Sequence, residues 1–150
     1  MVTPDSPTRL IALDWGTSSA RAYRLGAAGD VLERREAPLG ILHVRSGGFG
    51  AALVELLGDW AALAVPRIAA GMIGSRQGWI EAPYVDCPVD VAALAAGLVR
   101  TPGGEMAIVP GLVCRDSDGV PDVLRGEETQ LAGAVRDDEP DVVAVLPGTH

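Results

Sequence analysis

An aspartate followed by small hydroxyl residues, in the segment DWGTSSAR at residues 14–21, is the strongest chemical signal in the sequence. Gly16 allows a tight backbone turn, while Thr17 and Ser18 offer hydroxyls and amides to phosphate oxygens. Asp14 can orient water on a magnesium ion, which then separates the acid from the phosphates. The same residue types also build ordinary hairpins in which an aspartate caps its own turn. The segment therefore predicts either a phosphate loop with a water-mediated metal contact or a plain turn.

A second polar loop, GMIGSRQGW at residues 71–79, follows a short apolar run. Arg76 can fork onto a carboxylate, and Ser75 and Gln77 can bind hydroxyl groups. Trp79 would form a wall of such a site, which suits a polyhydroxy acid. The alternative is a surface loop whose tryptophan packs back over the core.

Two adjacent carboxylates, Glu127 and Glu128, lie in the segment RGEETQ at residues 125–130. Acids are common in the first turn of a helix because the helix dipole favours them there, so the pair alone predicts no chemistry. The sequence ends in LPGTH, with His43 as the other histidine. We do not expect a metal site from His43 and His150.

Periodicity predicts three strands followed by alternating helices and strands. The expected strands are residues 9–14, 20–25, 31–37, 67–72, 105–113 and 141–148, and the expected helices are 49–63, 90–99 (capped by Asp90) and 127–136, with a turn at 115–122. Three antiparallel strands that feed right-handed crossovers give a mixed sheet with helices on both faces. This order fits an α/β fold of the ribonuclease-H-like (actin-like ATPase) type. A Rossmann fold would begin strand–helix and carry GxGxxG.

The amino-acid composition favours some classes of protein and excludes others. The 150 residues suffice for one domain, and 48% hydrophobic with 4% aromatic residues predicts an aliphatic core. The net charge of −8 and the scattered arginines argue against a nucleic-acid surface. The sequence contains no lysine, which excludes the lysine-dependent P-loop.

Targeting and cysteine patterns carry little signal. No apolar run reaches the roughly 18 residues of a membrane span, and the N-terminal segment lacks the apolar core of a signal peptide, so we expect a cytoplasmic protein. Cys87 and Cys114 lie in unrelated sequence contexts without a CxxC motif, and we interpret them as reduced and structural.

The combination of segments resembles a known family. DxGT[ST]xxR on a first hairpin is similar to the first phosphate loop of the sugar kinase, Hsp70 and actin superfamily. The segments DWGTSSAR, GMIGSRQGW, RGEET and LPGTH, in this order, resemble the 2-dehydro-3-deoxygalactonokinase family, in which the last motif continues as PGTHSKW. The resemblance extends from about Leu10 to His150.

The resemblance implies roles for individual residues. Glu127, and less readily Glu128, would be the catalytic base, although a glutamate replaces the aspartate that hexose kinases of the superfamily use. The sugar acid would contact Ser75, Arg76, Gln77 and Trp79. Nucleotide phosphates, with Mg2+ held through water on Asp14, would contact Asp14, Gly16, Thr17, Ser18, Arg21, Gly148 and Thr149.

The activity implied is phosphorylation of 2-dehydro-3-deoxy-D-galactonate to its 6-phosphate by ATP with Mg2+, in galactonate catabolism. Residues 1–8 are expected to form a flexible N-terminus and residues 9–150 an N-terminal kinase lobe. The resemblance implies that the C-terminal lobe is absent from these 150 residues, so we expect the isolated chain to be inactive. The expected partners are the sugar acid and ATP, without nucleic acid or membrane, and a homodimer stays open.

Three alternatives remain at this point. One is a kinase for another sugar or sugar acid on the same scaffold, because fold alone does not choose a substrate. Another is a non-catalytic single-lobe fragment. The third is a nuclease of the ribonuclease-H-like class, which would need several acids converging on two metal ions near Asp14.

Overall fold

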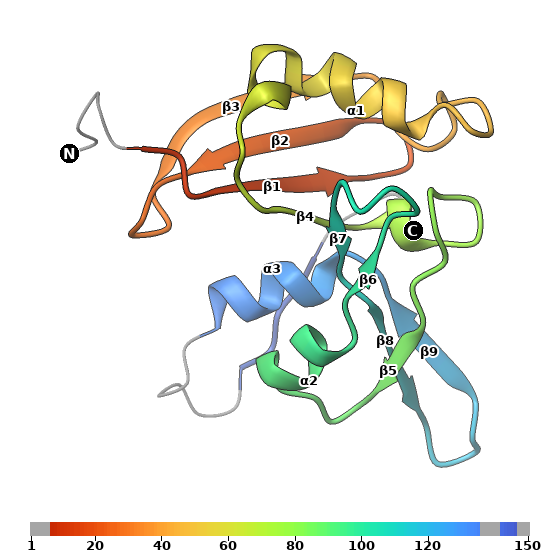
Figure 1. The fold of residues 1–150 in the computed structure, drawn as a ribbon. Helices are drawn as coiled ribbons and strands as arrows, with labels where there is room; N and C mark the ends of the chain where they lie inside the picture. Colours follow the sequence, from red (N-terminus) through yellow and green to blue (C-terminus); the bar gives the residue numbers. More distant parts are fainter. Residues whose placement is uncertain (1–6, 136–141, 147–150) are drawn as a thin grey trace.

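The computed structural model describes residues 7–135 and 142–146 as a mixed α/β structure with two sheets (Figure 1). A six-stranded sheet has the order β3-β2-β1-β4-β7-β6, and a three-stranded sheet has the order β5-β8-β9. The strands are β1 (Leu10–Trp15), β2 (Ala20–Leu25), β3 (Val31–Ala37), β4 (Arg67–Ala70), β5 (Tyr84–Asp86), β6 (Val99–Arg100), β7 (Ala107–Ile108), β8 (Gly111–Arg115) and β9 (Pro121–Leu124). The α-helices are α1 (Phe49–Leu57), α2 (Val91–Ala96) and α3 (Glu127–Ala134), with 3-10 turns η1 (Gly58–Ala62) and η2 (Met72–Gly74).

The antiparallel meander β1–β2–β3 confirms the first three predicted strands. In β1 the side chains of Ile11, Leu13 and Trp15 are buried, whereas the alternate positions are half-buried. This alternation points the apolar residues at α1, which supplies Phe49 and Leu53 to the same core cluster. Asp14, at an alternate position, therefore lies on the opposite face.

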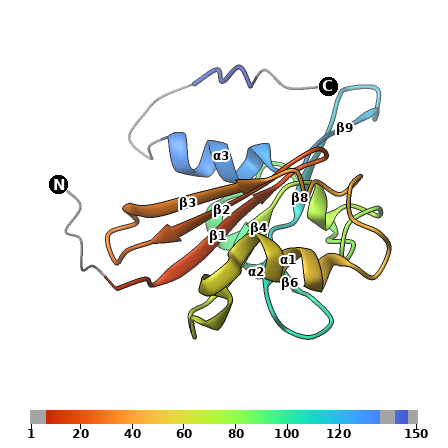
Figure 2. The same cartoon turned by 90° about the horizontal axis from the view of Figure 1, so that it is seen from above.

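Strand β4 joins the meander in parallel, pairing Ala70 with Asp14 of β1. Its side chains serve two cores: Ala69 belongs to the cluster under α1, whereas Ala70 and Ile68 belong to a second cluster with Leu94 of α2. Figure 2 shows α1 and α3 on opposite sides of the six-stranded sheet. The predicted mixed sheet with helices on both faces is thus present in the described residues.

The predicted helix over 49–63 changes character at Gly58. The α-helix ends there, where Gly58 adopts a φ of +53°, and a 3-10 turn carries the chain on to Ala62. Trp60 in this turn is almost fully buried, which keeps the segment on the core. The predicted cap of α2 is confirmed, because Asp90 accepts a hydrogen bond of 2.8 Å from the amide of Ala93.

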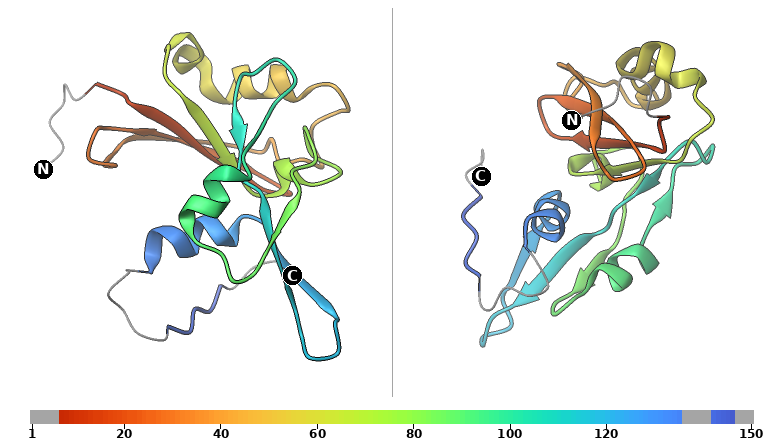
Figure 3. Two further views of the ribbon diagram at one scale, coloured as in Figure 1. Left: turned by 60° about the horizontal axis from the view of Figure 1, so that its bottom comes forward. Right: turned by 90° about the vertical axis from the view of Figure 1, so that its left-hand side faces the viewer.

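The single strand predicted over 105–113 is wrong. It divides at Pro110: β7 pairs with β4 in the six-stranded sheet, whereas β8 begins at Gly111 and pairs with β5 and β9 in the small sheet. Proline lacks an amide hydrogen and fixes φ, so it breaks the ladder at the change of sheet. Only the centre of the turn predicted over 115–122 is a turn, because β9 begins at Pro121. Figure 3 shows the β8–β9 hairpin extending away from the six-stranded sheet.

The strand predicted over 141–148 falls mostly on described residues 142–146, which are exposed and contain no strand. A strand requires a neighbour to pair with, and none of the described strands pairs with this segment. Residues 147–150, with Gly148 and Thr149, lie outside the described residues. None of the described helices is long and apolar enough to cross a membrane.

Cys87 and Cys114 are neighbours in space, which corrects the interpretation of unrelated contexts. The β5–β8 ladder pairs Asp86 with Val113, and the next residues along the two strands are these cysteines. Both are free thiols and both are exposed rather than buried in a core.

Candidate functional site

Three of the polar sequence segments, two loops and the start of α3, meet where β1 and β4 end. A Cβ on Gly71, directly after β4, would lie 2.8 Å from the carbonyl oxygen of Trp15, at the end of β1. A Cβ on Gly126, directly before α3, would lie 3.1 Å from the Cα of Gly71. Gly71 and Gly126 have φ values of +100° and +113°, a region that glycine enters without strain. These two glycines therefore bring residues 14–21, 71–79 and 125–130 to one edge of the sheet.

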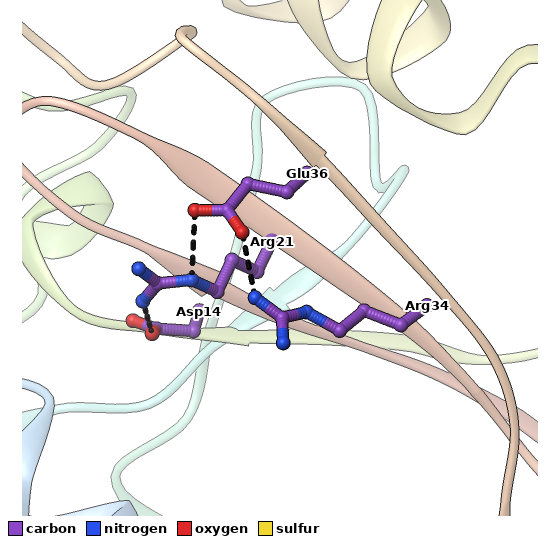
Figure 4. Close-up of polar contacts among 4 residues, drawn as sticks. All are labelled: Asp14, Arg21, Arg34 and Glu36. Atoms are coloured by element: carbon purple, nitrogen blue, oxygen red, sulfur yellow. Dashed lines mark hydrogen bonds and ion pairs between the residues drawn. The ribbon is translucent and has the colours of Figure 1, made fainter.

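Asp14 takes part in a chain of ion pairs across β1, β2 and β3 (Figure 4). Arg21 lies opposite Asp14 in the ladder and donates from Nη1 to Oδ2 at 3.1 Å. The same guanidinium donates from Nε to Glu36 at 3.1 Å, and Arg34 donates to Glu36 at 2.6 Å. The hydrogen bond to Asp14 raises the pKa of Arg21. Arg21, which the resemblance assigns to phosphate, thus lies beside Asp14 and holds its carboxylate.

Residues 39–42 fix the loop between β1 and β2, a contact that the sequence did not reveal. The carbonyl oxygens of Gly16, Thr17 and Ser18 accept hydrogen bonds of 3.0, 3.2 and 3.3 Å from the amides of the segment at 40–42. Trp15 donates from its indole to the carbonyl of Leu39 at 2.7 Å. The carbonyl groups of this loop are therefore occupied. The amides of Thr17 and Ser18 donate to no acceptor among the described residues.

Gly40 makes this contact possible, whereas Gly16 is not required for the turn. A Cβ on Gly40 would lie 2.3 Å from the carbonyl oxygen of Thr17, far inside contact distance. A Cβ on Gly16 would meet only the carbonyl oxygen of Ser19 at an ordinary 3.5 Å. The glycine that shapes the loop is therefore the one that packs against it. The sequence offered no sign of this beyond a proline–leucine–glycine run after a strand.

The loop at 71–79 is held by its own backbone. The amide of Trp79 donates to the carbonyl of Ile73 at 2.9 Å, and the hydroxyl of Ser75 donates to the carbonyl of Met72 at 2.7 Å. Arg76 and Gln77 are exposed and line an open hollow of about 480 Å3 with Trp79.

Trp79 also packs on the core, as the alternative interpretation of this loop expected. Its ring stacks on Phe49 at a centroid distance of 6.2 Å, and Phe49 meets Trp15 edge-on at 6.1 Å. This tryptophan is therefore both a wall of the hollow and part of the core that supports β1.

Glu127 and Glu128 have different environments. Glu128 is 2% exposed, its Oε2 accepts from the amide of Gly126 at 2.6 Å, and burial raises its pKa. Glu127 is half-buried, accepts from the amide of Arg125 at 3.0 Å and lines a hollow of about 540 Å3. Only Glu127 thus faces space that a substrate could occupy.

Arg125 was not singled out by sequence reasoning. Its guanidinium lies 4.3 Å from the ring centre of Tyr84 and donates to the carbonyl of Ala82 at 2.9 Å. It lines both the hollow that contains Glu127 and a neighbouring one of about 380 Å3 that contains Ser75 and Arg76. Its signal in the sequence was its place two positions before Glu127.

The donor set near Asp14 is suited to holding water on a metal rather than to enclosing the ion. Within residues 7–135 and 142–146 no group of three or more acids, histidines or cysteines could hold a metal ion. Magnesium commonly keeps several waters and uses one or two carboxylates together with substrate phosphates. The residues present fit that mode of binding. The converging acids that a two-metal nuclease would need are not found in this part of the chain.

Comparisons with known proteins identify relatives over nearly the whole chain. Residues 14–150 match the model of the family described as 2-keto-3-deoxy-galactonokinase. The chain is 39% identical over 142 residues to the 2-dehydro-3-deoxygalactonokinase of Escherichia coli (strain K12), covering 95% of this chain and 47% of the relative. It is 41% identical over 143 residues to a probable 2-dehydro-3-deoxygalactonokinase of Rhizobium meliloti (strain 1021), covering 93% and 46%.

A solved structure shares the fold. A crystal structure of a protein from Sinorhizobium meliloti, assigned to the 2-dehydro-3-deoxygalactonokinases, matches with a TM-score of 0.75 and 42% sequence identity over 83% of this chain and 42% of that one. This chain spans about half the length of the curated relatives it matches. The family match over residues 14–150 shows that the chain belongs to the 2-keto-3-deoxy-galactonokinase family.

Proposed function

We propose that this chain supplies one lobe of a kinase that transfers a phosphoryl group from ATP to the terminal hydroxyl of 2-dehydro-3-deoxy-D-galactonate. The observation that carries the proposal is the meeting of two polar loops and the start of α3 around Gly71 and Gly126. Phosphoryl transfer depends mostly on positioning and on electrostatic stabilisation, so it needs such a convergence of loops from separate elements.

The lobe is proposed to be ribonuclease-H-like and to comprise residues 9–150. An antiparallel three-strand meander followed by a parallel strand, with helices on either side of the sheet, supports this fold. In the superfamily that the sequence resembles, ATP lies between two lobes. By the same resemblance, Gly148 and Thr149, which lie outside the described residues, would contact its phosphates. The part of the relatives that this chain does not span would then complete the site.

The loop at 16–18 is proposed to bind the phosphates of ATP. Its carbonyls are bound to residues 40–42, so the amides and hydroxyls of Thr17 and Ser18 are left to donate to anionic oxygens. Asp14 would hold waters of Mg2+, whose positive charge offsets the charge of the phosphates when it is bound. Arg21 would keep the Asp14 carboxylate in place, which is a positioning role.

Glu127 is proposed as the base that accepts the proton of the substrate hydroxyl. It lines a hollow, and its carboxylate is oriented by the amide of Arg125. Glu128 is the weaker candidate because it is almost fully buried and both of its oxygens have partners within the start of α3. A base must come within hydrogen-bond distance of the proton it accepts.

The loop at 71–79 is proposed to hold the sugar acid. Arg76 would pair with the carboxylate of the substrate, with Ser75 and Gln77 at hydroxyl groups and Trp79 as a wall. Arg76→Ala should weaken binding of the keto acid markedly. Unchanged affinity of this variant would refute the assignment of the carboxylate contact.

A chimera tests the function. The matching region of the Escherichia coli relative is replaced by this chain, and ADP release is measured with ATP, Mg2+ and 2-dehydro-3-deoxy-D-galactonate, its C4 epimer or D-galactose. The unchanged relative is the control for the assay. We expect the galactonate derivative to be the best substrate, and Glu127→Gln to lower kcat by about 100-fold or more, with a smaller effect of Glu128→Gln. A folded chimera that prefers another sugar acid would support the alternative kinase.

The isolated chain is proposed to be inactive. One lobe leaves the transferring phosphoryl group open to water, and the chain spans about half the length of its curated relatives. Measurable ATP-dependent turnover by the 150-residue chain alone would contradict the two-lobe argument.

A further inference from the structure

The small sheet brings two thiols together that are 27 positions apart in the sequence. Strands β5 and β8 run parallel, with Tyr84 opposite Gly111 and Asp86 opposite Val113. The amide of Cys87 donates to the carbonyl of Val113 at 2.9 Å. In a parallel ladder, a residue that donates to a given carbonyl lies opposite the next residue of the partner strand. Cys87 therefore lies opposite Cys114.

The spacing suits a covalent link between the two residues. Neighbouring strands lie about 4.8 Å apart, and the Cα atoms of disulfides are about 4.4–6.8 Å apart. Side chains at opposite positions of two strands project from the same face of the sheet. Both cysteines are exposed, so a dissolved oxidant can reach them. Partial burial and the neighbouring Cys114 thiol raise the pKa of Cys87.

We propose that Cys87 and Cys114 form an oxidisable dithiol, a modification site that small-molecule disulfides such as oxidised glutathione convert to an intramolecular disulfide. One thiolate attacks a sulfur of the glutathione disulfide, whose S–S bond breaks and releases one reduced glutathione. The second thiolate then attacks the mixed disulfide, forms the Cys87–Cys114 bond and releases a second glutathione. The two thiol protons and two electrons of the protein end on the two glutathione molecules.

The link would restrain a defined part of the fold. The 87–114 segment contains α2, β6 and β7, and its side chains supply Leu94, Val109 and Leu112 to the second core cluster. Closing this segment limits the unfolded chain more than the folded one, so the oxidised form should melt at a higher temperature. The bond would also tie β8 to β5, the strand that carries Tyr84 beneath Arg125.

The sequence permits a direct test by mass spectrometry. Because the chain contains no lysine, trypsin cleaves only after arginine, and Cys87 falls in peptide 77–100 while Cys114 falls in peptide 101–115. The full chain is equilibrated in buffers of reduced and oxidised glutathione, blocked with N-ethylmaleimide and digested without reductant. We expect peptides 77–100 and 101–115 to be joined with the loss of two hydrogens, at least about tenfold in excess over either peptide carrying glutathione.

Matched controls separate proximity from simple thiol reactivity. In Cys87→Ser and Cys114→Ser, the remaining cysteine should carry glutathione instead, and the melting temperature should not rise on oxidation. In 6 M guanidinium chloride, the joined peptide should decrease several-fold because the fold no longer pairs the strands. The proposal fails if native and denatured chains give equal amounts of the joined peptide, or if wild type carries glutathione on both cysteines. A disulfide between two chains as the main product would also overturn it.

Discussion

Replacement of Gly40 by alanine tests how the loop at 16–18 is held. The new Cβ would lie 2.3 Å from the carbonyl oxygen of Thr17 and from the carbonyl carbon of Ser18. Both are backbone atoms, so no flexible side chain can move aside. The segment at 39–42 must therefore separate from the loop by about an ångström to restore an ordinary contact.

The expected loss follows from this separation. The amides of Gly40 and Leu42 would lose hydrogen bonds of 3.3 and 3.2 Å to the loop, each contributing about 1 kcal/mol. The steric strain of the added methyl group costs about 1–3 kcal/mol. The two costs overlap, because the separation that breaks the hydrogen bonds also relieves part of the strain. We expect the free energy of unfolding of Gly40→Ala to fall by about 2–4 kcal/mol. Urea denaturation followed by tryptophan fluorescence measures this change.

Gly16→Ala is the matched control, because the same substitution in the same loop creates only an ordinary contact at 3.5 Å. Its free energy of unfolding should change by less than about 1 kcal/mol. Equal stabilities of the two variants would refute the close approach between the loop and Gly40.

Three further outcomes follow from burial and exposure, each measured by urea denaturation. Burial raises the pKa of Glu128, so the folded state prefers its neutral form. Wild type should therefore lose stability relative to Glu128→Gln as the pH rises above 4.5, with no such divergence at lower pH. Asp14 and Arg21 are each 38% exposed, so a double-mutant cycle should give a coupling below about 1 kcal/mol that shrinks in high salt. Gly133→Ala, in α3 with no atom near its Cβ, should stabilise the fold by about 0.5–1 kcal/mol.

The longer elements could be predicted because their residues repeat with a clear period. The strand at 10–15 alternates half-buried and buried side chains throughout, the strand at 20–25 does so over residues 20–23, and α1 shows helical spacing. Strands β5, β6 and β9 have two to four residues, too few for any periodic signal. The division at Pro110 was missed because a single apolar run contains both β7 and β8, which belong to different sheets. Hydrophobicity alone does not indicate which strand each of them pairs with.

The candidate site was predictable by residue type and not by contact. Aspartate, hydroxyl residues and adjacent glutamates identify themselves as groups that can do chemistry. The roles of Gly40, Gly71 and Gly126 could not be predicted. The sequence does not distinguish a glycine that allows the close approach of another backbone segment from a glycine in an open turn. Arg125 was missed for a similar reason: its position between two hollows depends on Tyr84, 41 positions earlier in the chain.

The ion pairs around Asp14 bear on how an acid can lie beside the loop that is proposed to bind phosphates. Two acids, Asp14 and Glu36, alternate with Arg21 and Arg34, so these four side chains together carry no net charge although the chain carries −8. If the proposed function holds, an anionic nucleotide approaches this face without meeting an uncompensated carboxylate. Because the pairs are partly exposed, each holds its partner weakly. Asp14 could then exchange part of its contact with Arg21 for metal-bound water at low cost, as its proposed role toward Mg2+ and ATP would require.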